Sequence, residues 1–180
     1  MNKGRLLDSL RKNNFNESII RAFSKVQREE FIPLHLRRLS YEDIALPLEK
    51  GATISQPYTI AFMLQLLELK SSQKILEIGS GCGYVLALIS EIIKVGKIYG
   101  IEIISDLAKI SQEKLKKDKK IKIFNQDGSR GLPEQSQFDR ILISASAEKI
   151  PENLYSQLKN NGILVAPIRD SILQIKKQNR

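Results

Sequence analysis

The sequence feature that most constrains the fold is an apolar run that ends in three closely spaced glycines. Residues 75–78 read Ile-Leu-Glu-Ile, and Gly79, Gly81 and Gly83 follow before a second apolar stretch with helical spacing begins. This order fits a buried strand, a tight turn and a helix, because glycine adopts backbone angles that such turns need. The sequence therefore predicts a strand–turn–helix unit here.

A second apolar run, residues 97–102, reads as the next strand and ends in Glu102. An acid about 20 residues after the first glycine is typical of nucleotide-type cofactor sites, where it accepts hydrogen bonds from ribose hydroxyls. The glycines of such sites let the backbone approach the ligand, and a helix N-terminus follows. A plain strand-to-helix turn with an ordinary strand-end acid has the same pattern, so the motif alone leaves both interpretations open.

Strand-like and helix-like segments alternate through the rest of the chain. We expect strands near residues 74–78, 97–102, 121–124, 139–144 and 162–167, with a further strand over 171–176. We expect helices near 57–69, 83–94, 106–117 and 151–159, the last ending before Gly162. Such alternation predicts an α/β fold, Rossmann-like and doubly wound, with a mainly parallel sheet and helices on both faces.

The N-terminal part differs from this pattern. Residues 1–32 predict two helices, the second capped by Asn16, and residues 34–55 predict an irregular connection. A connection of that length is usually functional. We expect one domain of 180 residues, with helices and a covering loop in 1–56 and a cofactor-binding α/β core in 57–180.

Composition excludes several protein classes. The N-terminus lacks the apolar run of a secretory signal, and no apolar stretch is long enough to span a membrane. The single cysteine, Cys82, cannot form an internal disulfide, so we expect a cytoplasmic protein. A net charge of +9 suggests nucleic acid, but the seven lysines of residues 109–122 lack interleaved aromatics. Glu113 and Lys117 are spaced as on a solvated helix face, so we do not expect a nucleic-acid partner.

The residue inventory narrows the chemistry. One histidine and one cysteine cannot form the usual zinc ligand sets, so no metal is expected. His35 lies in a basic stretch far from the glycines, and Cys82 reads as a small packed side chain rather than a nucleophile. Dehydrogenases and methyltransferases remain as interpretations of the glycine turn.

Residues 51–58, Gly-Ala-Thr-Ile-Ser-Gln-Pro-Tyr, resemble the signature loop of the protein-L-isoaspartate O-methyltransferases. Further segments resemble that family in the same order, and together they cover nearly the whole chain: residues 28–33, 41–48, 75–84, 100–102, 127–133, 138–139, 150–151 and 162–167.

The resemblance implies S-adenosyl-L-methionine as cofactor. It places Gly79, Ser80 and Gly81 under the methionine end, with Glu77 supporting the amino group indirectly. The remaining expected contacts lie at three places: Glu102 at the ribose, Asp127 and Gly128 at the adenine edge, and Thr53, Ile54 and Ser55 folded over the ligands. Without the resemblance, Asp127 reads equally well as a turn-forming aspartate and Ser55 as a residue beside a helix cap.

The resemblance also implies the reaction, which is methylation of the free carboxylate of L-isoaspartyl or D-aspartyl residues in damaged proteins. Such a carboxylate is already ionised at neutral pH, so no general base is required. Catalysis can come from orientation and from the exclusion of water, and Ser55 is the expected catalytic residue because it would orient the acceptor. Damaged proteins or peptides are the expected partners of a monomeric enzyme.

Two departures from the family pattern leave alternatives open. Gln126 replaces the first glycine of a usual Gly-Asp-Gly, and the family commonly continues beyond Pro167 with a strand pair of which one strand is missing here. An unpaired sheet edge is then expected. The alternatives are a nucleic-acid methyltransferase and a shortened relative that binds cofactor without turnover.

Overall fold

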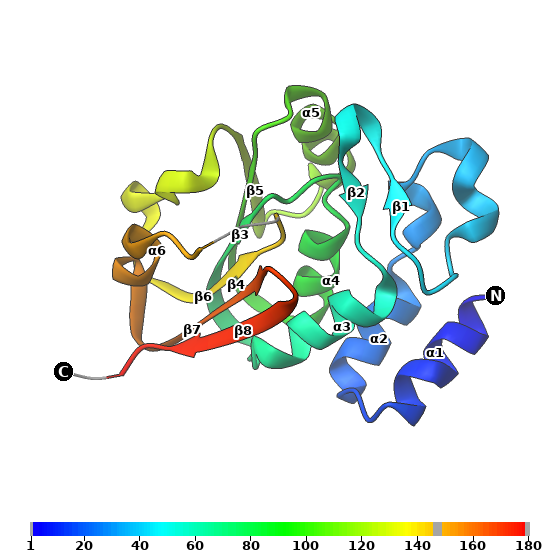
Figure 1. Cartoon of the computed structure of the whole chain (residues 1–180), viewed down its shortest axis with the longest axis horizontal. Coiled ribbons are helices and arrows are strands. Elements are labelled where there is room, and N and C mark those ends of the chain that lie inside the picture. The colour runs from blue at the N-terminus through cyan, green and yellow to red at the C-terminus, as the bar shows by residue number, and fades with distance from the viewer. Residues whose placement is uncertain (1, 146–148, 179–180) are drawn as a thin grey trace.

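The computed structural model describes residues 2–145 and 149–178, and a six-stranded sheet forms its centre (Figure 1). The strands of the sheet are β3 (Ser72–Ile78), β4 (Val95–Glu102), β5 (Ile121–Asn125), β6 (Phe138–Ile143), β7 (Leu158–Ile168) and β8 (Ser171–Lys176). The α-helices are α1 (Lys3–Lys12), α2 (Glu17–Lys25), α3 (Pro57–Leu66), α4 (Tyr84–Ile92), α5 (Ser105–Leu115) and α6 (Glu152–Ser156). The predicted α/β class, with its mainly parallel sheet, is confirmed.

The strand order is β5-β4-β3-β6-β7-β8, so the first strand of the alternation lies in the middle. The chain winds outward from β3 to β4 and β5, then crosses to β6 on the other side of β3. All these pairings are parallel, and only β8 runs antiparallel to its neighbour β7. The carboxyl ends of β3 and β6 therefore frame the point where the winding direction reverses, which is where ligands bind in such sheets.

The two faces of the sheet are covered unequally. Residues of α1 to α4 share one hydrophobic cluster with Ile75, Ile98 and Leu142 of the strands. The opposite face packs Leu76, Tyr99 and Ile141 against α6 and the segment before β6. Figure 1 shows α6 on the side of the sheet away from the four N-terminal helices. Helices thus lie on both faces, but among the described residues the second face carries a single short α-helix, α6.

The predicted irregular connection contains more local structure than the sequence suggested. Within residues 34–55 lie two 3₁₀ helices, η2 (Leu34–Leu39) and η3 (Glu49–Gly51), and two short strands, β1 (Leu46–Pro47) and β2 (Thr53–Ile54). β1 and β2 pair antiparallel, with Leu46 opposite Ile54. This ribbon forms because both of those side chains are buried in the cluster that also holds the N-terminal helices. A boundary between two parts at residue 56 stays a prediction.

The predicted helix over 151–159 was wrong over its last three residues. Helix α6 ends at Ser156, and β7 begins at Leu158, which pairs with Phe138. Gly162 lies inside that strand rather than at a helix stop, since its carbonyl accepts a hydrogen bond from Lys177 N–H at 2.9 Å. Long-range pairing overrides the local signal of the polar run 159–161, which forms an irregularity where β7 shifts register.

The lysine-rich segment also differs from its predicted form. Helix α5 ends at Leu115, so Glu113 pairs with Lys116 instead of with Lys117. Lys114 donates to the carbonyl of Glu30, and Lys120 donates to the carbonyl of Ile93 at 3.1 Å. At least two of the seven lysines therefore hold the fold together. No helix among the described residues combines the length and apolar character needed to cross a membrane.

A buried arginine on the central sheet holds the end of α3. The Arg140 side chain donates from Nε to the carbonyl of Leu67 and from Nη2 to that of Glu68 at 3.0 Å. Only 6% of Arg140 is exposed and Leu67 is fully buried, so losing these bonds leaves the buried carbonyl of Leu67 without this donor.

We expect Arg140→Met to lower the free energy of unfolding by about 1–3 kcal/mol, because the carbonyls lose their partners while the apolar stem is kept. Arg38→Met is the matched control, since Arg38 is exposed, and it should change stability by about 0.5 kcal/mol or less. Chemical denaturation of both variants measures the difference. Equal stabilities would show that Arg140 does not hold this helix end.

Candidate active site

The glycine turn after β3 is shaped by positive backbone angles. Gly79, Gly81 and Gly83 have φ values of 78°, 53° and 85°, and Gly83 immediately precedes α4. The N–H groups of Gly79 and Ser80 both donate to the carbonyl of Ile101 on β4, at 2.8 and 3.0 Å. The turn is therefore fastened to the neighbouring strand.

Two glycines allow close approach at the carboxyl edge of the sheet. A Cβ atom on Gly79 would lie 2.8 Å from the Cβ of Ala145, which follows β6. A Cβ on Gly128 would lie 2.5 Å from Cγ2 of Ile78. Neither contact is possible for a real side chain, so both positions need glycine. The segments after β3, β5 and β6 meet here.

Glu102 lies at the end of β4, and its carboxylate binds the turn. Oε2 accepts the N–H of Gly81 at 2.7 Å, and Oε1 accepts the N–H of Ile104 at 2.8 Å. The residue is 5% exposed. It does not line either of the two pockets described next, so a contact with ribose would have to use a remaining lone pair of these oxygens. Its predicted ribose role stays a prediction.

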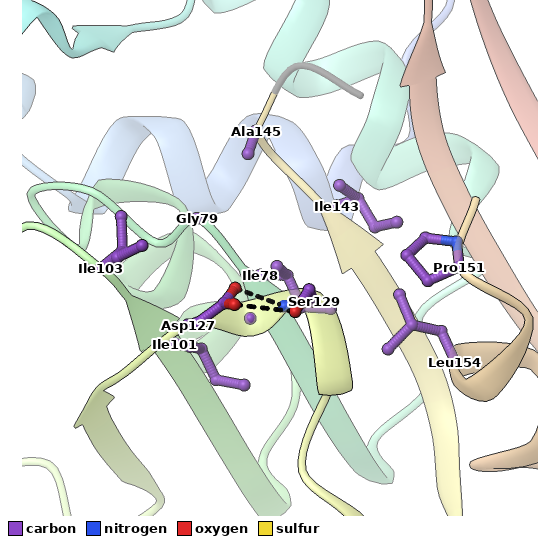
Figure 2. A pocket seen from close by; sticks show the side chains of 11 residues that line it. Ile78, Gly79, Ile101, Ile103, Asp127, Ser129, Ile143, Ala145, Pro151 and Leu154 are labelled. Atoms are coloured by element: carbon purple, nitrogen blue, oxygen red, sulfur yellow. Dashed lines mark hydrogen bonds between the residues drawn. The ribbon is translucent and has the colours of Figure 1, made fainter. Parts of the chain in front are cut away.

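A largely apolar pocket of about 260 Å³ opens at the reversal point of the sheet. Figure 2 shows side chains from the ends of β3, β4 and β6 and from α6 converging around it. Its lining residues are Ile78, Gly79, Ile101, Ile103, Asp127, Gly128, Ser129, Ile143, Ala145, Pro151 and Leu154. Such a pocket suits a flat, mostly apolar ring with polar edges.

Asp127 supplies the carboxylate of this pocket. Its two oxygens accept the N–H and the hydroxyl of Ser129, at 2.9 and 2.8 Å (Figure 2). These hydrogen bonds hold the pKa of Asp127 below its ordinary value. The carboxylate is therefore ionised and oriented, and it can accept a hydrogen bond from a ligand that enters the pocket.

A second, smaller pocket of about 40 Å³ joins the glycine turn to the covering loop. It brings together the residues predicted for the methionine end and those predicted for the covering loop: Glu77, Gly79, Ser80 and Gly81, with Thr53, Ile54 and Ser55. Cys82, Tyr84 and Ser144 also line it. Gly79 borders both pockets, so a ligand that crosses the glycine turn reaches both.

Glu77 is the buried acid of the small pocket. It is 1% exposed, and its Oε1 accepts the hydroxyl of Ser144 at 2.6 Å. Its Oε2 and the hydroxyl of Ser80 are buried without a hydrogen-bond partner. Burial raises the pKa of Glu77 to about 8, against a smaller lowering by the Ser144 hydrogen bond.

The covering loop is held by Arg28, a residue to which the sequence had assigned no role. The fully buried guanidinium donates to the carbonyl of Ser55 at 2.9 Å and to that of Ile44 at 3.2 Å. It lies over the ring of Tyr84, 5.5 Å from the centroid, at the start of α4. An arginine after Gln27 looks like a surface residue in sequence, so no local signal reveals this position.

The sequence predicted no catalytic role for Cys82 and His35, and the described part of the structure adds no contact that gives them one. Burial raises the pKa of the Cys82 thiol to about 11, so it is not a thiolate nucleophile at neutral pH. His35 lies on η2 and lines none of the pockets described here. The described residues hold no group of three or more His, Cys, Asp or Glu suited to a metal ion.

A third pocket, of about 290 Å³, adjoins the small one through Leu48 and Cys82. Its walls come from the N-terminal segment and from α5, and they include Phe31, Leu34 and Ile110. Leu34 is 75% exposed. Charged residues also line this pocket: Glu30, Arg37, Glu49 and Lys114. A surface with both apolar and charged groups that leads into the site could accept a chain of residues rather than a small molecule alone.

Comparison with known proteins identifies the family. The family model "Protein-L-isoaspartate(D-aspartate) O-methyltransferase (PCMT)" matches residues 1–180. This chain belongs to that family. The protein-L-isoaspartate O-methyltransferase of Methanothrix thermoacetophila is 40% identical over 171 residues, covering 93% of this chain and 81% of the relative. That of Petrotoga mobilis is 44% identical over 162 residues, covering 88% and 75%.

Solved structures of the family share the fold. One protein-L-isoaspartate O-methyltransferase has a TM-score of 0.88 at 28% identity, covering 99% of this chain and 61% of its own. A Plasmodium falciparum structure described as a β-aspartate methyltransferase has a TM-score of 0.86 at 27% identity, covering 99% and 91%. That structure contains S-adenosyl-L-homocysteine.

A substitution at Glu102 tests how much the glycine turn depends on its hydrogen bonds to the end of β4. In Glu102→Gln an NH₂ group replaces one oxygen, so one of the two backbone N–H groups would face a donor. We expect a loss of about 1–3 kcal/mol in the free energy of unfolding. Glu113→Gln on the exposed face of α5 is the control and should be near neutral. Wild-type stability of Glu102→Gln would contradict this account of the turn.

Proposed function

We propose that this chain transfers a methyl group from S-adenosyl-L-methionine to the free carboxylate of L-isoaspartyl and D-aspartyl residues in damaged proteins. The observation that carries this proposal is the small pocket, in which Ser55 of the covering loop and Glu77 below the glycine turn face one cavity. Family membership and the S-adenosyl-L-homocysteine bound by the Plasmodium falciparum relative support it.

The residues present suit this cofactor. The apolar pocket with the oriented carboxylate of Asp127 fits an adenine ring, whose amino group is a donor. The unpartnered Oε2 of Glu77 offers an acceptor to an ammonium group at the other end. Glu102 holds the glycine turn, whose Gly79 borders both pockets, and its oxygens could accept from ribose hydroxyls in addition to the backbone.

The bound cofactor supplies a methyl group on a sulfonium, so the carboxylate gains a C–O bond while the C–S electron pair returns to sulfur. Neither partner needs to lose a proton, which matches a site without a histidine or thiolate. The protein's part is to orient the acceptor through Ser55 and to exclude water through the covering loop. Orientation of this kind is worth up to about 7–11 kcal/mol in favourable cases.

Arg28 supports the proposed role of Ser55 in orienting the acceptor. Because its guanidinium holds the carbonyl of Ser55, it fixes the backbone from which the Ser55 side chain projects. The third pocket gives the acceptor polypeptide a route along Leu34 and Phe31 toward Ser55. A monomeric state and a cytoplasmic location remain part of the proposal.

The deciding assay offers an isoaspartyl peptide and RNA side by side with labelled S-adenosyl-L-methionine. We expect label in the peptide as a base-labile ester that releases methanol, and none in the RNA. Labelled RNA with an unlabelled peptide would favour the nucleic-acid methyltransferase. Cofactor binding without any methyl transfer would favour an inactive relative.

Ser55→Ala tests the assignment within the small pocket. We expect kcat toward an isoaspartyl peptide to fall about 10- to 100-fold with little change in cofactor affinity, because orientation of the acceptor is lost. Ser129→Ala is the contrasting variant. It removes a hydrogen bond to Asp127 and should weaken cofactor binding more than it lowers kcat. Equal loss of kcat and cofactor affinity in Ser55→Ala would mean that Ser55 serves the cofactor instead.

A further inference from the structure

The carboxyl group of Glu77 is buried in the small pocket, and burial makes its ionised form unfavourable. Glu77 lies on the central strand β3, between Gly100 of β4 and Leu142 of β6. One oxygen has the Ser144 hydroxyl, and the other has no partner. Burying a charged carboxylate in this way costs far more than burying a neutral one.

The groups that face Glu77 do not offer it a positive charge. Glu102 of β4 and Cys82 of the turn interact with it electrostatically, and neither is a cation. Directly after β6 it meets the Ser144 hydroxyl, and the covering loop adds Thr53 and Ser55 to the same pocket.

The lining residues from α3, α4 and the segment after β1 are apolar or hydroxylic: Leu48, Met63, Tyr84 and Val85. The ion pairs formed by the described residues do not include Glu77. Arg28, which lies over Tyr84, uses its two terminal nitrogens for Ser55 and Ile44 instead.

The protonation state follows from these contacts. Without ligand, the raised pKa of Glu77, about 8, leaves the side chain mostly protonated at pH 7. An ammonium group placed against Oε2 shifts the protonation equilibrium of Glu77 toward the ionised form, because an opposite charge within hydrogen-bond distance favours the carboxylate.

The family resemblance already places Glu77 near the amino group of the cofactor. We propose that ligand binding is coupled to deprotonation of this buried acid, so that Glu77 releases one proton to solvent each time the α-ammonium group of the ligand enters the small pocket. This rests on the proposed function, since it takes S-adenosyl compounds as the ligands. The acid carries no charge while the site is empty, and it becomes the counter-ion of the ammonium once the ligand is bound.

Calorimetric titration with S-adenosyl-L-homocysteine tests the proposal directly. At pH 7, in buffers of different ionisation enthalpy, the observed heat should vary with a slope near one proton released per ligand bound. Affinity should rise about tenfold from pH 6 to pH 7, where the ligand ammonium stays charged. 5′-Methylthioadenosine, which lacks the amino-acid part, should bind the adenine pocket with no proton release.

Two variants show whether Glu77 or another group releases the proton. Glu77→Gln keeps the shape of the protonated acid, so it should still bind 5′-methylthioadenosine. It should release no proton with S-adenosyl-L-homocysteine and lose the pH dependence of affinity. Asp127→Asn is the matched control at the other pocket. It should weaken both ligands while the proton count with S-adenosyl-L-homocysteine stays near one, because the lowered pKa of Asp127 leaves it ionised before binding.

Stability without ligand gives a second readout that does not depend on binding. A carboxyl whose pKa is raised on folding contributes stability fully below its unfolded value near 4.5, and that stability is lost as pH rises toward 8. Relative to Glu77→Gln, the wild-type chain should therefore lose stability between pH 5 and pH 8. A pH-independent difference between the two would contradict the buried neutral acid.

The outcomes distinguish this proposal from the proposed function. Normal binding of S-adenosyl-L-homocysteine with no proton released would overturn the role of Glu77 and leave methyl transfer intact. Release that persists in Glu77→Gln would assign the proton to another group and overturn it as well. No binding of any adenosyl compound would overturn the proposed function itself.

Discussion

The hydrogen bonds between the glycine turn and the end of β4 are the constraint on which the rest of the site depends. Ile101 supplies a carbonyl to two N–H groups of the turn, and Glu102 supplies a carboxylate to a third. Parallel pairing of β3 with β4 puts these partners at the same edge of the sheet. The turn is thus held before any ligand arrives, and the pockets on either side of Gly79 keep their relation to each other.

The two buried acids of the site illustrate how similar side chains acquire different properties. Each oxygen of Glu102 accepts a backbone N–H, so this side chain stabilises the turn in addition to its proposed contact with ribose. Glu77 has one hydroxyl partner and one empty acceptor, so burial acts on it without full compensation. A buried polar atom without a partner is rare in folded proteins, and at a ligand site it marks where a ligand group fits.

Much of the fold was predictable because its strands are short apolar runs bounded by glycines and acids. The strand over 171–176 was confirmed at both ends. The central strand was confirmed at its end, Ile78, but it begins at Ser72, two residues earlier than predicted. The helix predicted over 151–159 was too long at its C-terminal end, because the pairing of Leu158 with Phe138 is not visible in local periodicity. The ribbon of Leu46 and Ile54 was missed for the same reason, since it depends on burial against distant helices.

The sequence by itself determined the order of strands and helices along the chain, the glycine turn that begins at Gly79, and, through its resemblance to a family, the residues to inspect. Only the tertiary structure decided that Arg28 would hold Ser55, that Ile103, Pro151 and Leu154 would line the adenine-type pocket, and that one oxygen of Glu77 would be left unpaired. The physical reason is that turns and strands follow from local backbone preferences, whereas burial and partners depend on residues that approach each other only after the sheet has formed.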